Sequence, residues 1–174
     1  MSQLQSSTDS PEIDQKAWIR AIDDALAMIA RDTLGLDGTR MAESQSTSPA
    51  KGIRGAYISL VDGEVSVLIG LRSSGEDCER LTRYMMAMED DEPVEDEDVT
   101  GVVAEIVNIV AGVVKSSIGE AELRLGIPMV VSGRVTPANQ QEVAFYVVEI
   151  GEAKLEVLLL HRRKRPRGRL RKAS

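Results

Sequence analysis

Apolar residues recur at helical spacing in three segments of the chain. In residues 17–35, "AWIRAIDDALAMIARDTLG", they follow one another every three or four positions until Gly35, which predicts an amphipathic helix. Ser10 and Pro11 precede this segment as a capping hydroxyl and a first-turn proline. A second helix is predicted over residues 75–88, "GEDCERLTRYMMAM", after Ser73 and Ser74. Its inward face comprises Leu81, Tyr84, Met85 and Met88.

Alternating apolar and polar residues predict β-strands. Residues 55–71 alternate on both sides of Asp62 and Gly63, a pair that suits the two-residue type I′ turn of a hairpin. Three further strands are predicted over "IPMVVSGRV", "QEVAFYVVEI" and "AKLEVLLLH", which are residues 127–135, 141–150 and 153–161. Residues 41–52 are interpreted as a polar connection, and residues 89–98, with eight acids in ten, as a solvated turn.

The third helical segment is "TGVVAEIVNIVAGVV", residues 100–114, which carries a carboxylate and an amide among valines and isoleucines. At about 100° per residue, the apolar positions cover about half of the helix and predict a buried face. That face comprises Val102, Val103, Ile106, Val107, Ile109, Val110, Val113, Val114 and Ile118. The remaining arc holds Asp98, Gly101, Ala104, Glu105, Asn108, Ala111, Gly112 and Lys115.

The two glycines of this arc are unexpected, because each costs roughly 0.5–1 kcal/mol against alanine inside a helix. An idle solvent face is normally filled with Lys, Glu and Arg. We therefore expect something to approach the arc closely. The approaching surface is a binding partner or, alternatively, another part of the same protein or a second subunit that packs there.

Composition agrees with helices packed on a sheet. The chain has 174 residues, 43% of them hydrophobic, with one Trp, three Tyr and one Phe, so it can bury one core built mainly from aliphatic side chains. We predict an α/β (α+β) domain with three helices packed on a five- or six-stranded, mostly antiparallel sheet. Neither a membrane span nor a signal peptide is recognisable in the sequence, so we expect a cytoplasmic protein without membrane insertion.

Charge divides the chain into unequal parts. Residues 162–174 carry eight Lys or Arg and no acid, so the rest of the chain carries −15 against a total of −7. We predict a flexible N-terminus over residues 1–9, a globular domain over residues 10–161 and a basic, disordered tail over residues 162–174. A nucleic-acid or membrane-surface function of this tail is disfavoured, because the acidic domain repels a phosphate backbone and no stacking aromatic accompanies the arginines. The binding partner of the tail is left open.

The sequence predicts no metal site and no cofactor of its own. Asp96 and Asp98 imitate the start of a calcium loop, but the twelfth position, which requires a Glu, is Val107. Cys78 is the single cysteine, which excludes a cysteine metal cluster and an internal disulfide, and we expect it to be a buried small hydrophobe. Because no glycine-rich phosphate loop is present, a phosphate has to arrive on a partner.

Glu105 and Asn108 are the candidate catalytic residues. An amide donates and accepts hydrogen bonds without charge, so Asn108 can orient a water molecule beside a phosphoryl group. A carboxylate repels phosphate, so Glu105 is better suited to a cation on the partner that carries the phosphate. Phosphoryl hydrolysis requires chiefly a positioned water and charge balance, so two side chains suffice. The predicted partner-binding residues around this pair are Gly101, Ala104, Gly112 and Lys115.

These residues resemble the CheX chemotaxis phosphatases, relatives of CheC and FliY that dephosphorylate the response regulator CheY. The resemblance covers about residues 13–160 and rests on "EIVN" at 105–108 followed by "AG", and on "IPMVVSG" at 127–133. The family motif is a Ser or Asp, three residues, Glu, two residues, Asn, and a later Pro, and Glu105, Asn108 and Pro128 match it. Gly101 stands in place of the Ser or Asp, and Pro128 comes about two residues early.

The resemblance implies a reaction and a partner. It implies that Asn108 orients the water that attacks an aspartyl phosphate, that Glu105 pairs with a lysine of the regulator, and that Mg²⁺ belongs to the regulator. It also implies one site per chain and a homodimer formed through the sheet, for which residues 141–150 are a suitable edge strand. The alternative function is a module that binds a response regulator without hydrolysing its phosphate.

Overall fold

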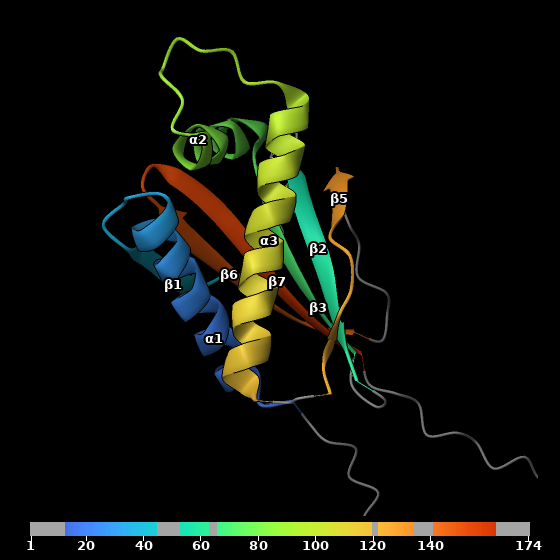
Figure 1. Cartoon of the computed structure of the whole chain (residues 1–174). Coiled ribbons are helices and arrows are strands. Elements are labelled where there is room, and N and C mark those ends of the chain that lie inside the picture. Colours follow the sequence, from blue (N-terminus) through green and yellow to red (C-terminus); the bar gives the residue numbers. More distant parts are fainter. Residues whose placement is uncertain (1–12, 45–52, 63–65, 120–121, 134–140, 163–174) are drawn as a thin grey trace, which may run out of the picture.

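The computed structural model describes residues 13–44, 53–62, 66–119, 122–133 and 141–162. Its helices are α1 (Gln15–Met28), α2 (Gly75–Met86) and α3 (Asp96–Ile118), with a π-helical turn η1 (Ile29–Thr33) after α1. Its strands are β1 (Thr39–Glu43), β2 (Arg54–Val61), β3 (Ser66–Ser73), β4 (Arg124–Leu125), β5 (Met129–Ser132), β6 (Gln141–Ile150) and β7 (Ala153–Arg162). Helices α1 and α3 cover one face of the sheet, and α2 lies near the N-terminal end of α3 (Figure 1).

The sheet confirms the predicted fold class and contains more strands than the sequence indicated. The strand order is β1-β6-β7-β3-β2-β4, and β5 also pairs with β2, so the described sheet has seven strands. All pairings between the described strands are antiparallel. The two additional strands, β1 and β4, have five and two residues.

The prediction of a polar connection over residues 41–52 is wrong for its first three residues. Residues 41–43 continue β1, and Met41 pairs with Val148 of β6. Met41 is the single residue of β1 that packs against the core, so backbone pairing with β6 contributes more to this strand than side-chain burial does. Strand β6 is therefore not an edge strand along its whole length, since its C-terminal half from Tyr146 to Ile150 is paired with β1.

The hairpin of β2 and β3 forms as predicted, but its turn is longer. Val61 pairs with Ser66, so four residues connect the strands instead of the two of a type I′ turn. Residues 63–65 lie outside the described part of the chain. The longer turn moves the partner of each β2 residue by two positions along β3, which retains the same residues on the helix-facing side. The hydrophobic alternation was therefore unable to distinguish the two registers.

The helix starts show which capping signals operate. Helix α1 begins at Gln15, and the Asp14 side chain accepts a hydrogen bond from Ala17 N at 3.2 Å. This cap replaces the predicted Ser10 and Pro11, which lie outside the described residues. Helix α2 is capped as predicted, because Ser74 Oγ accepts a hydrogen bond from Asp77 N at 3.1 Å. The expected N-terminal segment 1–9 and the tail from residue 163 also lie outside the described residues, whereas Arg162 ends β7.

The core lies between the sheet and the helices. Alternate residues of β2 and β3 fill it with α1 and with the predicted apolar face of α3, which is buried or packs against the core. Ala111, expected on the outward arc, is 0% exposed and belongs to the core instead. Cys78 is also fully buried, which confirms its predicted role as a small hydrophobe. By length and composition α3 is apolar enough to cross a membrane, and in this fold its apolar side is a core face.

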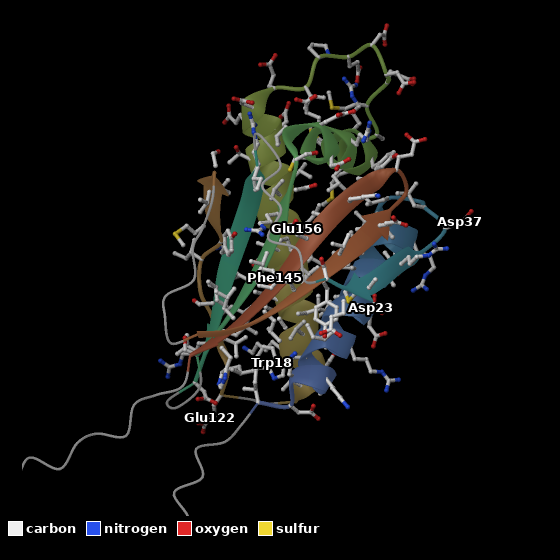
Figure 2. All side chains as sticks on the ribbon, turned by 180° about the vertical axis from the view of Figure 1, so that it is seen from behind. Trp18, Asp23, Asp37, Glu122, Phe145 and Glu156 are labelled. Atoms are coloured by element: carbon white, nitrogen blue, oxygen red, sulfur yellow. The ribbon has the colours of Figure 1, made fainter. Side chains whose placement is uncertain are left out.

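The opposite face of the sheet is viewed in Figure 2, where Phe145 and Glu156 lie on β6 and β7. On this face Arg72 forms an ion pair with Glu156, and its guanidinium lies 6.0 Å from the centroid of the Phe145 ring. The Arg72 side chain is only 7% exposed. Tyr57 lies across Gly70 of β3, where an added Cβ would overlap the tyrosine ring. On this face, side chains of neighbouring strands therefore pack against one another and cover part of the sheet.

Candidate functional site

Helix α3 presents the two candidate catalytic side chains to solvent. Glu105 and Asn108 are both exposed, as the predicted arc requires. On an ideal helix they are separated by about 60° of rotation and about 4.5 Å along the axis. Within the described part of the chain, neither side chain makes a hydrogen bond or an ion pair. Both side chains are therefore available to a molecule that approaches from outside.

The glycines beside this pair also lie in open space. A Cβ built on Gly101 or on Gly112 would have no described atom within 4 Å. No described neighbour therefore requires glycine at either position, and the alternative that another part of the same chain packs on this arc has no contact to support it among these residues. Because glycine has no side chain, this side of α3 is flat at both positions, whereas the opposite side of the helix packs in the core.

The other predicted partner-binding residues lie along the same side of α3. Ala104 and Lys115 are half-buried, as is Gly112, and they border the exposed pair. The Ser116 hydroxyl donates a hydrogen bond to the Gly112 carbonyl oxygen at 3.0 Å. Gly101 and Gly112 are eleven positions apart, which is about 16 Å along a helix, so the predicted residues lie in one narrow row along α3. Ala111 does not belong to that row.

An ion pair fixes the beginning of α3 to the sheet. Asp96 Oδ1 lies 2.7 Å from Arg54 Nη1 at the start of β2. The hydrogen bond with Asp96 raises the pKa of Arg54, and the charge of Asp96 adds to this effect. Asp96, Glu97 and Asp98 occupy the first turn, where negative charge favours the helix dipole. This contact explains the role of Asp96, and the described residues contain no group of three or more His, Cys, Asp or Glu side chains that would hold a metal ion.

Pro128 precedes strand β5, which lies at the edge of the sheet beside α3 (Figure 1). The proline is half-buried, whereas its neighbour Ile127 is one of the most exposed apolar residues described. The sequence predicts a strand over residues 127–135, of which the structure has β5 at Met129–Ser132. It gives no sign that Leu125, Ile127 and Val130 are exposed. An apolar run indicates a buried strand by default, and nothing in the run itself shows that the strand lies at an edge.

The chain matches the model of a known protein family. The family model described as "Chemotaxis phosphatase CheX" matches residues 56–150, which contain most of the hairpin, α2, α3 and all of β6. Glu105, Asn108 and Pro128 all lie within the matched region. No curated protein sequence matches the chain.

Solved structures share the fold at low sequence identity. A putative chemotaxis protein from Desulfovibrio vulgaris Hildenborough has a TM-score of 0.68 at 15% identity, covering 86% of this chain and 99% of its own. The complex of CheX with CheY, BeF3 and Mg²⁺ from Borrelia burgdorferi gives 0.65 at 20% identity, covering 83% and 97%. The chemotaxis protein CheX from Desulfovibrio desulfuricans gives 0.63 at 16% identity, with the same coverage of 83% and 97%. At these identities the structures establish the fold.

Proposed function

This chain belongs to the CheX family of chemotaxis phosphatases, and we propose from this premise that it hydrolyses the aspartyl phosphate of a CheY-type response regulator. Family membership makes the chain a phosphatase. The nature of the substrate is supported by the Borrelia burgdorferi complex, in which a CheX protein of the same fold is bound to CheY with BeF3 and Mg²⁺. The observation that carries the proposal is the pair of exposed, unengaged side chains, Glu105 and Asn108, on the open side of α3.

Asn108 orients the attacking water in this proposal. Its amide accepts a hydrogen bond from the water, and it brings no charge that repels the phosphoryl oxygens. The water oxygen forms a bond to phosphorus, the bond between phosphorus and the aspartyl oxygen breaks, and the regulator carboxylate leaves with the electron pair. The products are inorganic phosphate and the unmodified aspartate. The rigid helix supplies the positioning on which this reaction chiefly depends.

Glu105 binds the regulator in this proposal. One helical turn from Asn108, its carboxylate pairs with a lysine beside the phosphoaspartate of the regulator. Mg²⁺ is carried by the regulator, where it balances the phosphoryl charge. Gly101 stands where the family pattern has Ser or Asp, so in this chain the site works with two functional side chains on an open surface.

We propose further that the protein is a cytoplasmic homodimer formed through the sheet. Strand β6 extends beyond its pairing with β1, which ends near Phe145. Among the described residues, the N-terminal half of β6 is therefore paired only with β7. An unpaired strand edge is suited to pairing with a copy of itself around a two-fold axis. Sedimentation at micromolar concentration tests this point, and a monomer would contradict it without affecting the catalytic residues.

The catalytic proposal is tested by Asn108→Ala and Glu105→Ala, with phosphate release from a phosphorylated CheY as the assay. Asn108→Ala should lower turnover by roughly 10²-fold or more, the scale for losing one positioned transition-state contact. It should leave the affinity for the regulator nearly unchanged. Glu105→Ala should weaken binding as well, because a charge pair is lost. Asn108→Asp should be no better than alanine, since it keeps the volume but faces the phosphoryl group with a negative charge.

Two outcomes would contradict this assignment. If Asn108→Ala releases phosphate at the wild-type rate, the site binds without hydrolysing and the binding-module alternative applies. If either alanine variant unfolds, the side chain supports a packed interface. Both side chains are exposed, so we expect the free energy of unfolding to change little, within about 0.5 kcal/mol. Circular dichroism with denaturant titration measures that change.

A further inference from the structure

Apolar side chains are exposed along the sheet edge that borders α3. Ile127 is 89% exposed, Leu125 38% and Val130 36%, although each is a large aliphatic residue. These three residues form an apolar strip: Leu125 belongs to β4, Val130 belongs to β5, and Ile127 lies in the segment between the two strands. Figure 1 shows this part of the chain running beside α3 over much of its length.

The strand register places two members of the strip on the same side of the sheet as α3. Leu125 pairs with Leu60, and Val130 pairs with Ala56. Leu60 and Ala56 are both core residues beneath the helices, and directly paired residues point to the same face of a sheet. Leu125 and Val130 therefore point into the helix layer at its open border. Met129 pairs with Tyr57 and points to the opposite face.

The strip is held in place by the backbone on both sides. Gly126 N donates a hydrogen bond to Ser59 O at 2.7 Å, and Gly133 N donates one to Ile53 O at 2.8 Å. A Cβ at position 126 would overlap the Ser59 hydroxyl, so glycine there permits the close approach of the segment to β2. The exposed side chains between these anchor points are thus presented by a fixed backbone.

We infer that the apolar strip is a second contact surface for the response regulator, beside the site on α3. This inference rests on the proposed function, because it takes the regulator to be bound at Glu105 and Asn108. A specific protein complex buries about 800 Å² on each partner, and even transient ones bury several hundred. The exposed arc of α3 is made largely of Gly, Ala, Glu and Asn, whose small or polar side chains offer a partner little apolar surface. A domain centred on Asn108 therefore also covers a neighbouring element.

Helix α3 is flanked along its length by α1 and by the apolar strip, while α2 lies near its N-terminal end, and the two flanking elements differ in the side chains they expose. On one side lies α1, whose exposed residues are all polar: Gln15, Lys16, Arg20 and Asp24. On the other side lies the apolar strip. Covering exposed aliphatic side chains is favourable by about 25 cal/mol per Å², whereas covering charged side chains requires matching partners. The regulator is therefore placed over α3 and the strip, where it is oriented by the strip and dephosphorylated at Asn108.

The test uses Ile127→Ser and Val130→Ser, with Met129→Ser as the matched control. Met129 is 58% exposed on the same strand and points to the other face of the sheet. Phosphate release from phosphorylated CheY gives kcat and KM, and binding of CheY with BeF3 and Mg²⁺ gives Kd. Each strip variant should raise KM and Kd by about tenfold, the scale of losing one covered aliphatic side chain, with kcat kept. Met129→Ser should leave all three values unchanged.

The outcomes separate this inference from the function on which it rests. Unchanged KM and Kd in both strip variants, with an active wild-type protein, would overturn the strip and leave the function intact. Equal losses in the control and the strip variants would also overturn it. If the strip variants sediment as smaller species while KM stays constant, a second copy covers the strip and the inference fails. If wild-type protein neither binds CheY with BeF3 and Mg²⁺ nor releases phosphate, function and strip fail together.

Discussion

Asp23 is a residue of α1 whose surroundings act against its charge. Burial raises the pKa of its carboxyl above the usual value, and the charge of Asp24 raises it further. The folded chain therefore binds this proton more tightly than the unfolded chain, so Asp23 contributes stability only at low pH. That contribution is lost as the pH rises through the folded-state pKa. At neutral pH the ionised carboxylate destabilises the fold.

Asp23→Asn should therefore stabilise the protein at neutral pH, and the gain should disappear as the pH falls toward 3.8, the ordinary value for an aspartate. Denaturant unfolding at a series of pH values measures this dependence. Asp24→Asn serves as the comparison and should give a smaller gain, because it removes only the second cause of the shift. A gain from Asp23→Asn that is independent of pH would show that the carboxylate charge is not responsible.

At the scale of one element, α3 combines a packed face with a face of small residues. The helix has normal α geometry at Gly101 and Gly112, and a Cβ at either position meets nothing within 4 Å. Gly101→Ala should therefore raise the free energy of unfolding by about 0.5–1 kcal/mol, because alanine favours the helix. In the proposed complex the same methyl group faces the regulator, so KM for phosphorylated CheY should increase.

The control for this prediction is Ser117→Ala, an exposed position of α3 on the other side of the helix. It should change stability slightly and leave KM unchanged. Thermal unfolding and phosphate release are sufficient measurements. If Gly101→Ala stabilises the protein and leaves phosphatase kinetics unchanged, the glycine is not required for close approach of a partner.

The elements also show which parts of the fold can be predicted from sequence. The bounds of β6 and the buried face of α3 follow from alternation and helical periodicity, because burial on one side leaves a strong pattern. Strand β1 leaves almost no pattern, since its backbone pairs with β6 while its side chains are largely exposed or half-buried. Ala111 was misplaced because alanine is tolerated both in a core and on a surface.

The candidate site was also predicted from the periodicity of apolar residues, and only as far as that periodicity reaches. Glu105 and Asn108 lie in the gap of the apolar pattern, so their exposure followed from the sequence. The strip at Leu125, Ile127 and Val130 did not, because an edge position depends on strand order, and strand order is set by contacts between distant segments. The role of Glu105 and Asn108 in catalysis and the role of the strip in binding are predictions.

At the scale of the whole molecule, the described sheet ends at the first residue of the basic tail. Strand β7 ends at Arg162, and its last core residue is Leu159. A chain that ends at Arg162 should therefore keep its free energy of unfolding and its phosphatase activity, because no described core residue is removed. A loss of folding would show that the tail belongs to the domain. If only capture of CheY at low salt weakens, the tail attracts the partner electrostatically.

The placement of Glu105 and Asn108 on a single turn of α3 has a consequence for how such a protein changes over generations. Their separation is fixed by the hydrogen-bonded helix itself and not by the meeting of distant loops. In the proposed mechanism the chemistry is thus inherited in a stretch of four residues. Substitutions on the exposed side of α3 can then silence it, while the sheet, the core and every strand pairing stay as they are.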